Sequence, residues 1–338
     1  MSDSTKPQRK PLNCGVKLFL GFVAFVAFAM YVGLSDMRDP RWQGGKSGDS
    51  IHPVNVYGYP KTLRPPGSKE VVIPRFPKRI VAANCGAADI LSAMISTKRL
   101  AAVPDQVENY AADPAFWKDH ASIPRFEKFH AERILGYRPD LVISSAFQDG
   151  GPAAAIEQQR VPILYLKDFE SLDEIRSTIA IVGEAVGAQV EATKMIDDFD
   201  TRLKKIDARL DGVKPVGVVE YSNFGTGYTV GSGVCQDNIL TRAGGVNVAS
   251  AQGMKGNVPL TFEQLLRMDP EYIVVTGDTG LESPQAKLIL NEPVLKELRA
   301  VKNRHIAVVP TRYFDALSQY AVNAVEIIAG QLHPEKKP

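Results

Sequence analysis

The stretch ERILGYRPDLVI, residues 132–143, recurs further along the chain as EQLLRMDPEYIVV, residues 263–275. In both copies a glutamate stands seven residues before a proline, and an apolar run follows the proline. The pattern predicts a short helix that ends near the proline and then a buried strand. A helix-to-strand unit that occurs twice predicts two similar α/β lobes with a cleft between them.

Other apolar runs supply further strands and helices on both sides of the chain's midpoint. Strands are predicted at 71–73, 80–83, 100–103, 161–166, 216–219 and 306–309, and helices at 89–95, 172–186, 236–243 and 318–332. The order strand, helix, strand indicates parallel sheets. Residues 188–210 place Phe199, Leu203, Ile206 and Leu210 on one stripe and charged residues opposite, which predicts a helix of roughly 35 Å. Such a helix can join two lobes, although a surface helix of a single domain has the same pattern.

The predicted organisation is therefore α/β, with two Rossmann-like lobes joined by one long helix and a ligand cleft between the lobes. We expect a signal peptide or membrane anchor at 1–35, a flexible linker at 36–65, an N-terminal α/β lobe at 66–187, a connecting helix at 188–212 and a C-terminal α/β lobe at 213–338. At 338 residues the chain has room for two lobes with cores of their own.

The amino-terminal region has the composition of an export element. Lys6, Arg9, Lys10 and Lys17 precede the uncharged stretch 18–34, whose length lies between a signal-peptide core and the ~20 residues that span a bilayer. Ala27-Phe28-Ala29 fits a cleavage site, but the apolar run continues to Leu34, which favours an uncleaved anchor. In either case the residues after Ser35 are expected outside the cytoplasm.

Charge and glycine pattern argue against two classes of ligand. A net charge of +2, with no basic run interleaved with aromatics, gives no basis for nucleic-acid binding. Gly225-x-Gly227 and Gly231-x-Gly233 lack the third glycine of a dinucleotide loop, and no GxxxxGK[ST] occurs. A loop that lines a cleft is the better interpretation of these glycines.

Catalytic and metal-binding patterns are also lacking. The five histidines, at 52, 120, 130, 305 and 333, include no pair spaced i, i+2 or i, i+4, so a protein-only metal site is poorly supported. No nucleophile, base and orienting group occur in a recognisable pattern. We therefore expect a protein that is not an enzyme and has no cofactor of its own.

The repeated glutamates, Glu132 and Glu263, each open a predicted helix, where the helix dipole favours a carboxylate. That explanation suffices for one glutamate alone. Two glutamates at matching positions in two lobes would also present a symmetric pair of anionic contacts to a dimeric, basic partner.

Several segments together resemble one family. They are PRFPKRIVAAN (74–84), FHAERILGYRPDLVIS (129–144), VPILYL (161–166), AGGVNVA (243–249) and LTFEQLLRMDPEYIVV (260–275). From about 69 to 332, the chain is similar to the periplasmic substrate-binding proteins of iron-siderophore, haem and vitamin B12 ABC importers. The resemblance implies two lobes joined by a rigid helix and a ligand between them. It also implies that Glu132 and Glu263 dock into basic pockets of a permease dimer.

The same resemblance places ligand contacts in the loops after the strands. The implied ligand-binding residues are Cys85, Arg125, Phe126, Tyr221, Tyr228, Cys235, Lys255, Arg312 and Tyr313, with Asn84, Gly86, Asp105, Asn109 and Asn223 nearby. Arg and Lys would pair with an anionic chelate, and Tyr would stack on it or coordinate it. The family commonly has a small residue or Ser where Cys85 stands. Cys85 and Cys235 could be free, ligating or bonded to each other, and free thiols are favoured.

The resemblance implies a monomeric substrate-binding protein that captures an iron complex, most simply a ferric siderophore, and delivers it to an ABC permease dimer with its ATPase. Haem or a corrinoid is an alternative ligand, and a membrane-tethered sensor without a permease is an alternative role. The expected location is the periplasm of a diderm bacterium, since no lipid-attachment cysteine follows the apolar run. Residues 18–34 would hold the protein at the inner membrane if they are not cleaved.

Overall fold

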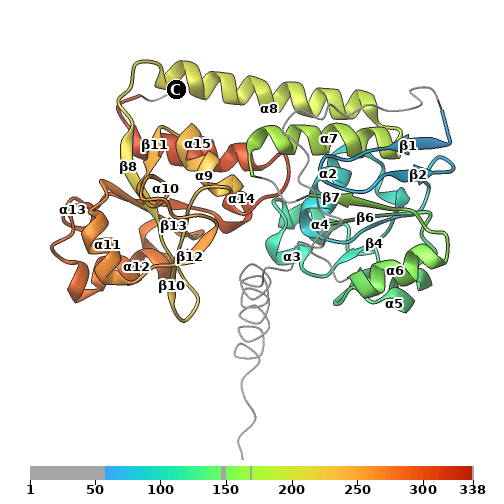
Figure 1. Cartoon of the computed structure of the whole chain (residues 1–338), viewed down its shortest axis with the longest axis horizontal. Coiled ribbons are helices and arrows are strands. Elements are labelled where there is room, and N and C mark those ends of the chain that lie inside the picture. Colours follow the sequence, from blue (N-terminus) through green and yellow to red (C-terminus); the bar gives the residue numbers. More distant parts are fainter. Residues whose placement is uncertain (1–57, 146–149, 168–169, 337–338) are drawn as a thin grey trace, which may run out of the picture. The chain divides into compact units, whose positions relative to one another are not determined.

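The computed structural model describes residues 58–145, 150–167 and 170–336. The predicted signal or anchor segment and most of the predicted linker lie outside these ranges. Within them, no helix combines the length and the apolar character needed to cross a membrane. The described part of the chain is mixed α/β with two parallel sheets, which confirms the predicted fold class (Figure 1).

A five-stranded parallel sheet with the order β5-β4-β3-β6-β7 lies in the first half of the chain. Its strands are β3 (Ile80–Ala82), β4 (Leu100–Pro104), β5 (Arg125–Phe126), β6 (Leu141–Ser145) and β7 (Ile163–Leu166). The connecting helices are α2 (Cys85–Met94), α3 (Val107–Tyr110), α4 (Pro114–Asp119), α5 (Ala131–Gly136) and α6 (Gly150–Gln158), with the 3-10 turn η1 (Thr97–Arg99). Parallel neighbours need such crossovers, so the alternation of strands and helices accounts for the topology.

A four-stranded parallel sheet with the order β11-β8-β13-β14 lies in the second half. Its strands are β8 (Val216–Glu220), β11 (Gly245–Asn247), β13 (Tyr272–Thr276) and β14 (Ile306–Val309). Its helices are α9 (Cys235–Arg242), α10 (Val248–Ala251), α11 (Phe262–Met268), α12 (Pro284–Asn291), α13 (Arg299–Lys302), α14 (Thr311–Phe314) and α15 (Ala321–Leu332), with η2 (Gly280–Glu282) and η3 (Pro293–Leu295). Both copies of the sequence repeat are a short helix followed by a strand inside a parallel sheet, as predicted.

The glycine-rich stretch is not one loop, which corrects the sequence interpretation. It contains β9 (Ser222–Asn223) and β10 (Gly227–Val230), which form an antiparallel sheet with β12 (Asn257–Pro259). A Cβ at Gly227 would lie 2.3 Å from the Leu260 carbonyl oxygen, and one at Gly231 would lie 2.3 Å from the Met254 carbonyl oxygen. The glycines therefore permit close approach between backbone segments, which is a known reason for glycine in strands.

Two long helices follow the first sheet, α7 (Leu172–Val186) and α8 (Gln189–Leu210). Gly187 ends α7 in the left-handed region, at φ 67°, where glycine carries no steric penalty. The buried residues of α8 are Ala192, Phe199, Leu203 and Ile206, which lie on the predicted stripe. This helix contacts α2 and α7 as well as α15, so it packs against helices that adjoin both parallel sheets (Figure 1).

A hairpin of β1 (Lys61–Leu63) and β2 (Val71–Ile73) lies partly inside the stretch expected as linker, 36–65. The Lys61 ammonium is buried, donates to the Glu184 carbonyl oxygen at 3.0 Å and pairs with the Glu184 carboxylate at 2.6 Å. Tyr59 Oη donates to the Ala185 carbonyl and Arg99 to the Val186 carbonyl. Three successive carbonyls at the end of α7 are thus satisfied by side chains. The predicted linker extends too far, because residues from Tyr59 onward cap this helix.

The segment between α14 and α15 contacts α2 of the first half. The Leu317 carbonyl oxygen lies so close to α2 that a Cβ at Gly86 would be 2.8 Å from it. Gln319 Nε2 donates to the Asp89 carbonyl oxygen at 3.2 Å. Elsewhere, the α7 amide of Leu172 donates to Asn238 Oδ1 on α9 at 3.0 Å. Residues of the first half, in α2 and α7, are therefore in direct contact with residues of the second half.

Candidate functional site

The repeated glutamates occupy the same position in two short helices. Glu132 is the second residue of α5 and Glu263 the second residue of α11, and both side chains are exposed. Two residues further on, Ile134 and Leu265 are fully buried and fix each helix to its core. Hydrogen bonds from its own backbone amide and from the Thr261 hydroxyl lower the pKa of Glu263, so its carboxylate is charged at neutral pH.

In the first sheet, the predicted ligand contact Cys85 is the first residue of α2, directly after β3. Its helix is capped by Asn84, whose Oδ1 accepts from the Ala87 amide at 2.8 Å. Cys85 is partly buried and lies beside Gly86, which is in close contact with Leu317 of the second half. The structure therefore places Cys85 at the carboxyl end of the first sheet, next to the contact between α2 and the segment that contains Leu317.

Arg125 and Phe126 form the short strand β5, and both have structural contacts. The Arg125 guanidinium donates to the carbonyl oxygens of Ile123 at 2.7 Å and Trp117 at 2.9 Å. It also lies 3.6 Å from the Glu108 carboxylate. Phe126 is 2% exposed and belongs to the core. These contacts occupy Arg125 in ordering the 117–123 turn and leave little of Phe126 available to a ligand.

Two predicted contacts of the second half are buried. Tyr221 follows β8, is 2% exposed and stacks on Phe262 with ring centroids 5.6 Å apart. Cys235 is the first residue of α9 and is 3% exposed. Both residues face the protein interior, so ligand contact would require their neighbours to move.

Tyr228 and Lys255 are more accessible. Tyr228 is half-buried in β10, and Lys255 is exposed at an isolated parallel bridge to Ser232. The loop that carries Lys255 is bonded to the loop after β10: Ser232 N donates to the Met254 carbonyl and Gly231 N to the Gly256 carbonyl. The amides around Gly231 are therefore used inside the protein, which agrees with the rejection of a phosphate loop.

Arg312 and Tyr313 lie together on α14, after β14. The Arg312 guanidinium pairs with the Asp278 carboxylate and lies 4.9 Å from the centroid of the Tyr313 ring. About a quarter of the Arg312 side chain is exposed (28%). A ligand carboxylate could share this guanidinium with Asp278 or replace Asp278 on it.

Asp89 in α2 and Glu220 at the end of β8 are two buried acids that sequence reasoning missed, each 3% exposed. Burial raises the pKa of Asp89 to about 7 and that of Glu220 to about 8. Glu220 Oε2 has no hydrogen-bond partner among the described residues. The available signal was a single acid in each of the apolar runs AADILSAM and VGVVE.

Both described cysteines, Cys85 and Cys235, are free thiols. Burial raises the pKa of each thiol to about 12, with a smaller contribution from Asp89 near Cys85 and from Glu174 near Cys235. Neutral thiols are weak metal ligands, because the thiolate is the ligating form. Among the described residues, no group of three or more His, Cys, Asp and Glu side chains is placed to hold a metal ion.

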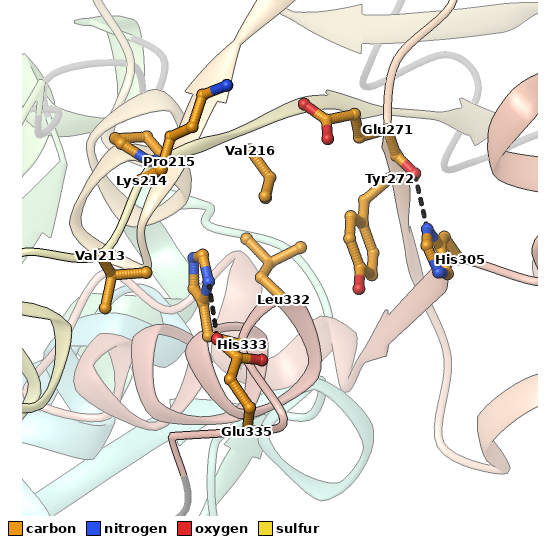
Figure 2. A pocket seen from close by; sticks show the side chains of 10 residues that line it. All are labelled: Val213, Lys214, Pro215, Val216, Glu271, Tyr272, His305, Leu332, His333 and Glu335. Carbon is orange, nitrogen blue, oxygen red and sulfur yellow. Dashed lines mark hydrogen bonds and ion pairs between the residues drawn. The ribbon is translucent and has the colours of Figure 1, made fainter.

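A cavity of about 390 Å³ lies away from the predicted ligand positions, at the amino-terminal edge of the second sheet. Figure 2 shows its lining, which includes His305, His333 and Glu271. His305 Nδ1 lies 3.2 Å from the Glu271 carbonyl oxygen, and its ring stacks on Tyr272 at 4.4 Å. His333 Nε2 lies 3.1 Å from the Gly244 carbonyl oxygen. Both imidazoles are thus engaged with the backbone.

Several known proteins are similar in sequence to this chain. The chain is 23% identical over 320 residues to an uncharacterized ABC transporter substrate-binding lipoprotein of Bacillus subtilis, YvrC, across 92% of this chain and 95% of that protein. It is 21% identical over 207 residues to a cobalamin-binding protein of Halobacterium salinarum, across 60% of this chain and 56% of that protein. It is 25% identical over 181 residues to the Fe(3+) dicitrate-binding periplasmic protein FecB of Escherichia coli, across 52% of this chain and 57% of that protein.

Among solved structures, the fold is similar to that of the periplasmic heme-binding protein RhuT from Roseiflexus sp. RS-1 in its apo form. The TM-score is 0.67 at 22% sequence identity, and the match covers 77% of this chain and 99% of RhuT. Residues 80–313 match the family described as periplasmic binding protein, which covers both parallel sheets and the long helices between them. The resemblance found in the sequence is confirmed, and the chain belongs to the periplasmic binding protein family.

Proposed function

We propose that this protein is the substrate-binding component of an ABC importer and presents Glu132 and Glu263 to the two halves of a permease. The observation that carries the proposal is the matched, exposed position of these glutamates on α5 and α11. Exposed carboxylates at equivalent places in two similar sheets suit a symmetric partner with one basic pocket in each subunit. The relative YvrC, described as an ABC transporter substrate-binding lipoprotein, supports the same role.

The proposed ligand is an iron complex, most simply a ferric siderophore, held between the two sheets at the carboxyl ends of their strands. In open α/β sheets this end is where ligands bind. Arg312, Tyr313, Tyr228 and Lys255 are the accessible candidates, since each is at least partly exposed. A cationic and aromatic set of this kind suits an anionic, ring-bearing chelate. The described relative FecB binds ferric dicitrate, which supports an iron complex.

Haem and corrinoids are the alternative ligands within the same role. The cobalamin-binding relative and the haem-binding neighbour RhuT motivate them.

The proposed lobes are 66–187 and 213–338, with 188–212 as the connecting helix. Retention at the inner membrane by residues 18–34 is part of the proposal, and a tethered sensor without a permease is the alternative role.

Ligand identity can be tested with the full chain purified from the cell envelope. Native mass spectrometry would detect a complex retained from the cell. Titration calorimetry with ferric citrate, a ferric hydroxamate, hemin and cyanocobalamin would then rank affinities, with Arg312→Gln as the matched variant. We expect micromolar or tighter binding of a ferric chelate and roughly 10- to 150-fold weaker binding by the variant, since a lost charge-assisted contact costs about 1.5–3 kcal/mol. Tighter binding of hemin or cyanocobalamin would replace the siderophore proposal, and no binding of any probe would contradict the transport role.

A further inference from the structure

Each copy of the repeat contains a backbone turn of the same unusual kind. Arg138, directly before Pro139, has φ 52°, and Asp269, directly before Pro270, has φ 37°. Residues before proline normally adopt extended backbone, and residues other than glycine rarely adopt positive φ. The same rare turn therefore ends the glutamate-bearing helix in both sheets.

An arginine secures the left-handed residue of each turn. Arg79 Nε donates to the Arg138 carbonyl oxygen at 3.1 Å. Arg299 Nη2 donates to the Asp269 carbonyl oxygen at 2.7 Å. The two arginines come from different elements, the approach to β3 and the start of α13, so the same chemical contact is made from two places in the fold.

The acid that follows each proline makes a second contact. Asp140 donates its amide to the Arg79 carbonyl at 2.9 Å, and its Oδ1 accepts from the Arg79 amide at 2.9 Å. Glu271 donates its amide to the Gly217 carbonyl at 2.8 Å, and its Oε1 accepts from the Gly217 amide at 3.1 Å. Each acid thus exchanges two hydrogen bonds with one residue, Arg79 just before β3 or Gly217 in β8, and the Asp140 carboxylate also accepts from the Lys78 amide at 2.9 Å. Figure 2 shows Glu271 at the edge of the cavity, where its carbonyl also meets His305.

The helices that end in these turns have little stability of their own. Helix α5 has six residues and α11 has seven, well below the roughly 12 residues at which isolated helices become marginally stable. Glu132 and Glu263 lie about 10 Å from the turns, at ~1.5 Å per helical residue. A small rotation at the turn would therefore move the glutamate, and few buried residues hold these helices: Ile134 in α5, and Leu265 and Met268 in α11.

We propose that Asp140 and Glu271 are positioning residues for partner docking. By fixing each proline turn to the adjacent strand, they hold Glu132 and Glu263 at one separation and orientation. A dimeric partner with two basic pockets at a fixed spacing requires such rigidity, since loose contacts lose the entropy of ordering on binding. The proposal rests on the docking function proposed above. It adds two side chains that do not touch the partner themselves.

The test measures the affinity of the full-chain protein for its own permease–ATPase complex in nanodiscs by biolayer interferometry. Asp140→Ala and Glu271→Ala should each weaken association about tenfold or more. Glu271→Gln keeps an acceptor for the Gly217 amide and should stay within about threefold of the wild type. Asp113→Ala is the matched control, because Asp113 Oδ1 accepts from the Phe116 amide at 3.0 Å and so caps α4, a helix that carries neither glutamate.

Epistasis separates positioning from a general loss of stability. In a Glu132→Gln/Glu263→Gln background the alanine substitutions should cause no further loss, because the groups they position are gone. Arg299→Ala, at a half-exposed side chain, tests the turn without removing a buried group and should also weaken association. The proposal is overturned if the alanine variants and Arg299→Ala bind normally, if Glu271→Gln is as weak as Glu271→Ala, or if the effects add to the glutamate background. Normal binding by the double glutamate variant would overturn the docking function as well.

Discussion

Asp140 and Glu271 each exchange two hydrogen bonds with one residue next to or in the adjacent strand, Arg79 for Asp140 and Gly217 for Glu271. This relationship shows that the sequence repeat is also a repeat of three-dimensional contacts. Each copy contains an exposed glutamate, a buried apolar residue, a left-handed turn before proline, and an acid bonded to the next strand. The surfaces that present Glu132 and Glu263 are thus built in the same way.

Lys61 is predicted to contribute strongly to stability. Its ammonium is 3% exposed and pairs with Glu184 at 2.6 Å, so Lys61→Met would leave a buried carboxylate without its cation. We expect the free energy of unfolding to fall by about 3–5 kcal/mol. Arg64→Met in the same hairpin is the control, because its side chain is 67% exposed and its pair with Glu70 should contribute under about 1 kcal/mol. Equal effects in urea unfolding would contradict the capping role of Lys61.

Glu220 should make stability fall as pH rises. Burial raises its pKa from 4.5 to about 8 in the folded protein, so the folded state binds more protons than the unfolded chain between these values. Stability is therefore lost progressively from pH 4.5 to about 8 and stays low above it. Glu220→Gln should be more stable than the wild type at pH 9 by up to about 4 kcal/mol, and close to it at pH 4. Parallel pH profiles for variant and wild type, measured by urea unfolding, would show that Glu220 is not the cause.

Gly86 should be intolerant of a side chain. A Cβ there would lie 2.8 Å from the Leu317 carbonyl, a backbone atom that cannot move without shifting the segment between α14 and α15. Gly86→Ala should lower the free energy of unfolding by about 1–3 kcal/mol. Gly151→Ala in α6 meets no atom within 4 Å and should be neutral or stabilising by up to about 1 kcal/mol. Similar melting temperatures for the two variants would argue against close contact at Gly86.

Cys85 and Cys235 should resist alkylation in the folded protein. Burial raises the pKa of both thiols to about 12, so the reactive thiolate is scarce at neutral pH. Treatment with iodoacetamide at pH 7.5 and peptide mapping should find both residues unmodified, and the same treatment in urea should modify both. Rapid labelling of the folded protein would indicate exposed thiolates.

Helices and strands with a strong apolar periodicity could be predicted from the sequence. The ligand-contact residues could be predicted only in part. The predicted helix 172–186 and strand 306–309 match α7 and β14, because long apolar patterns and a glycine stop leave few alternatives. The sequence around Gly227 predicts a loop, since nothing local shows that its glycines allow two backbone segments to approach each other. Burial of Phe126 and Tyr221 likewise depends on neighbours distant in sequence.

The predicted boundary between the linker and the N-terminal lobe, at residues 65 and 66, is wrong for a related reason. Composition alone made residues up to 65 resemble a linker, whereas Tyr59 and Lys61 cap a helix more than a hundred residues away, at Ala185 and Glu184. Asp140 and Glu271 were visible within the repeat, but their bonds to Arg79 and Gly217 could not be read from either copy. Local pattern therefore identified the repeated unit, and only tertiary contacts revealed how it is fixed.

The most direct test of permease docking is the affinity of the Glu132→Gln/Glu263→Gln protein for its permease–ATPase complex in nanodiscs, measured beside its affinity for its ligand. Each lost charge contact should cost about 2 kcal/mol or more, so association should weaken by roughly thirtyfold per glutamate while ligand affinity is unchanged. Unaltered association with the permease would contradict the claim that the repeated glutamates are the docking contacts.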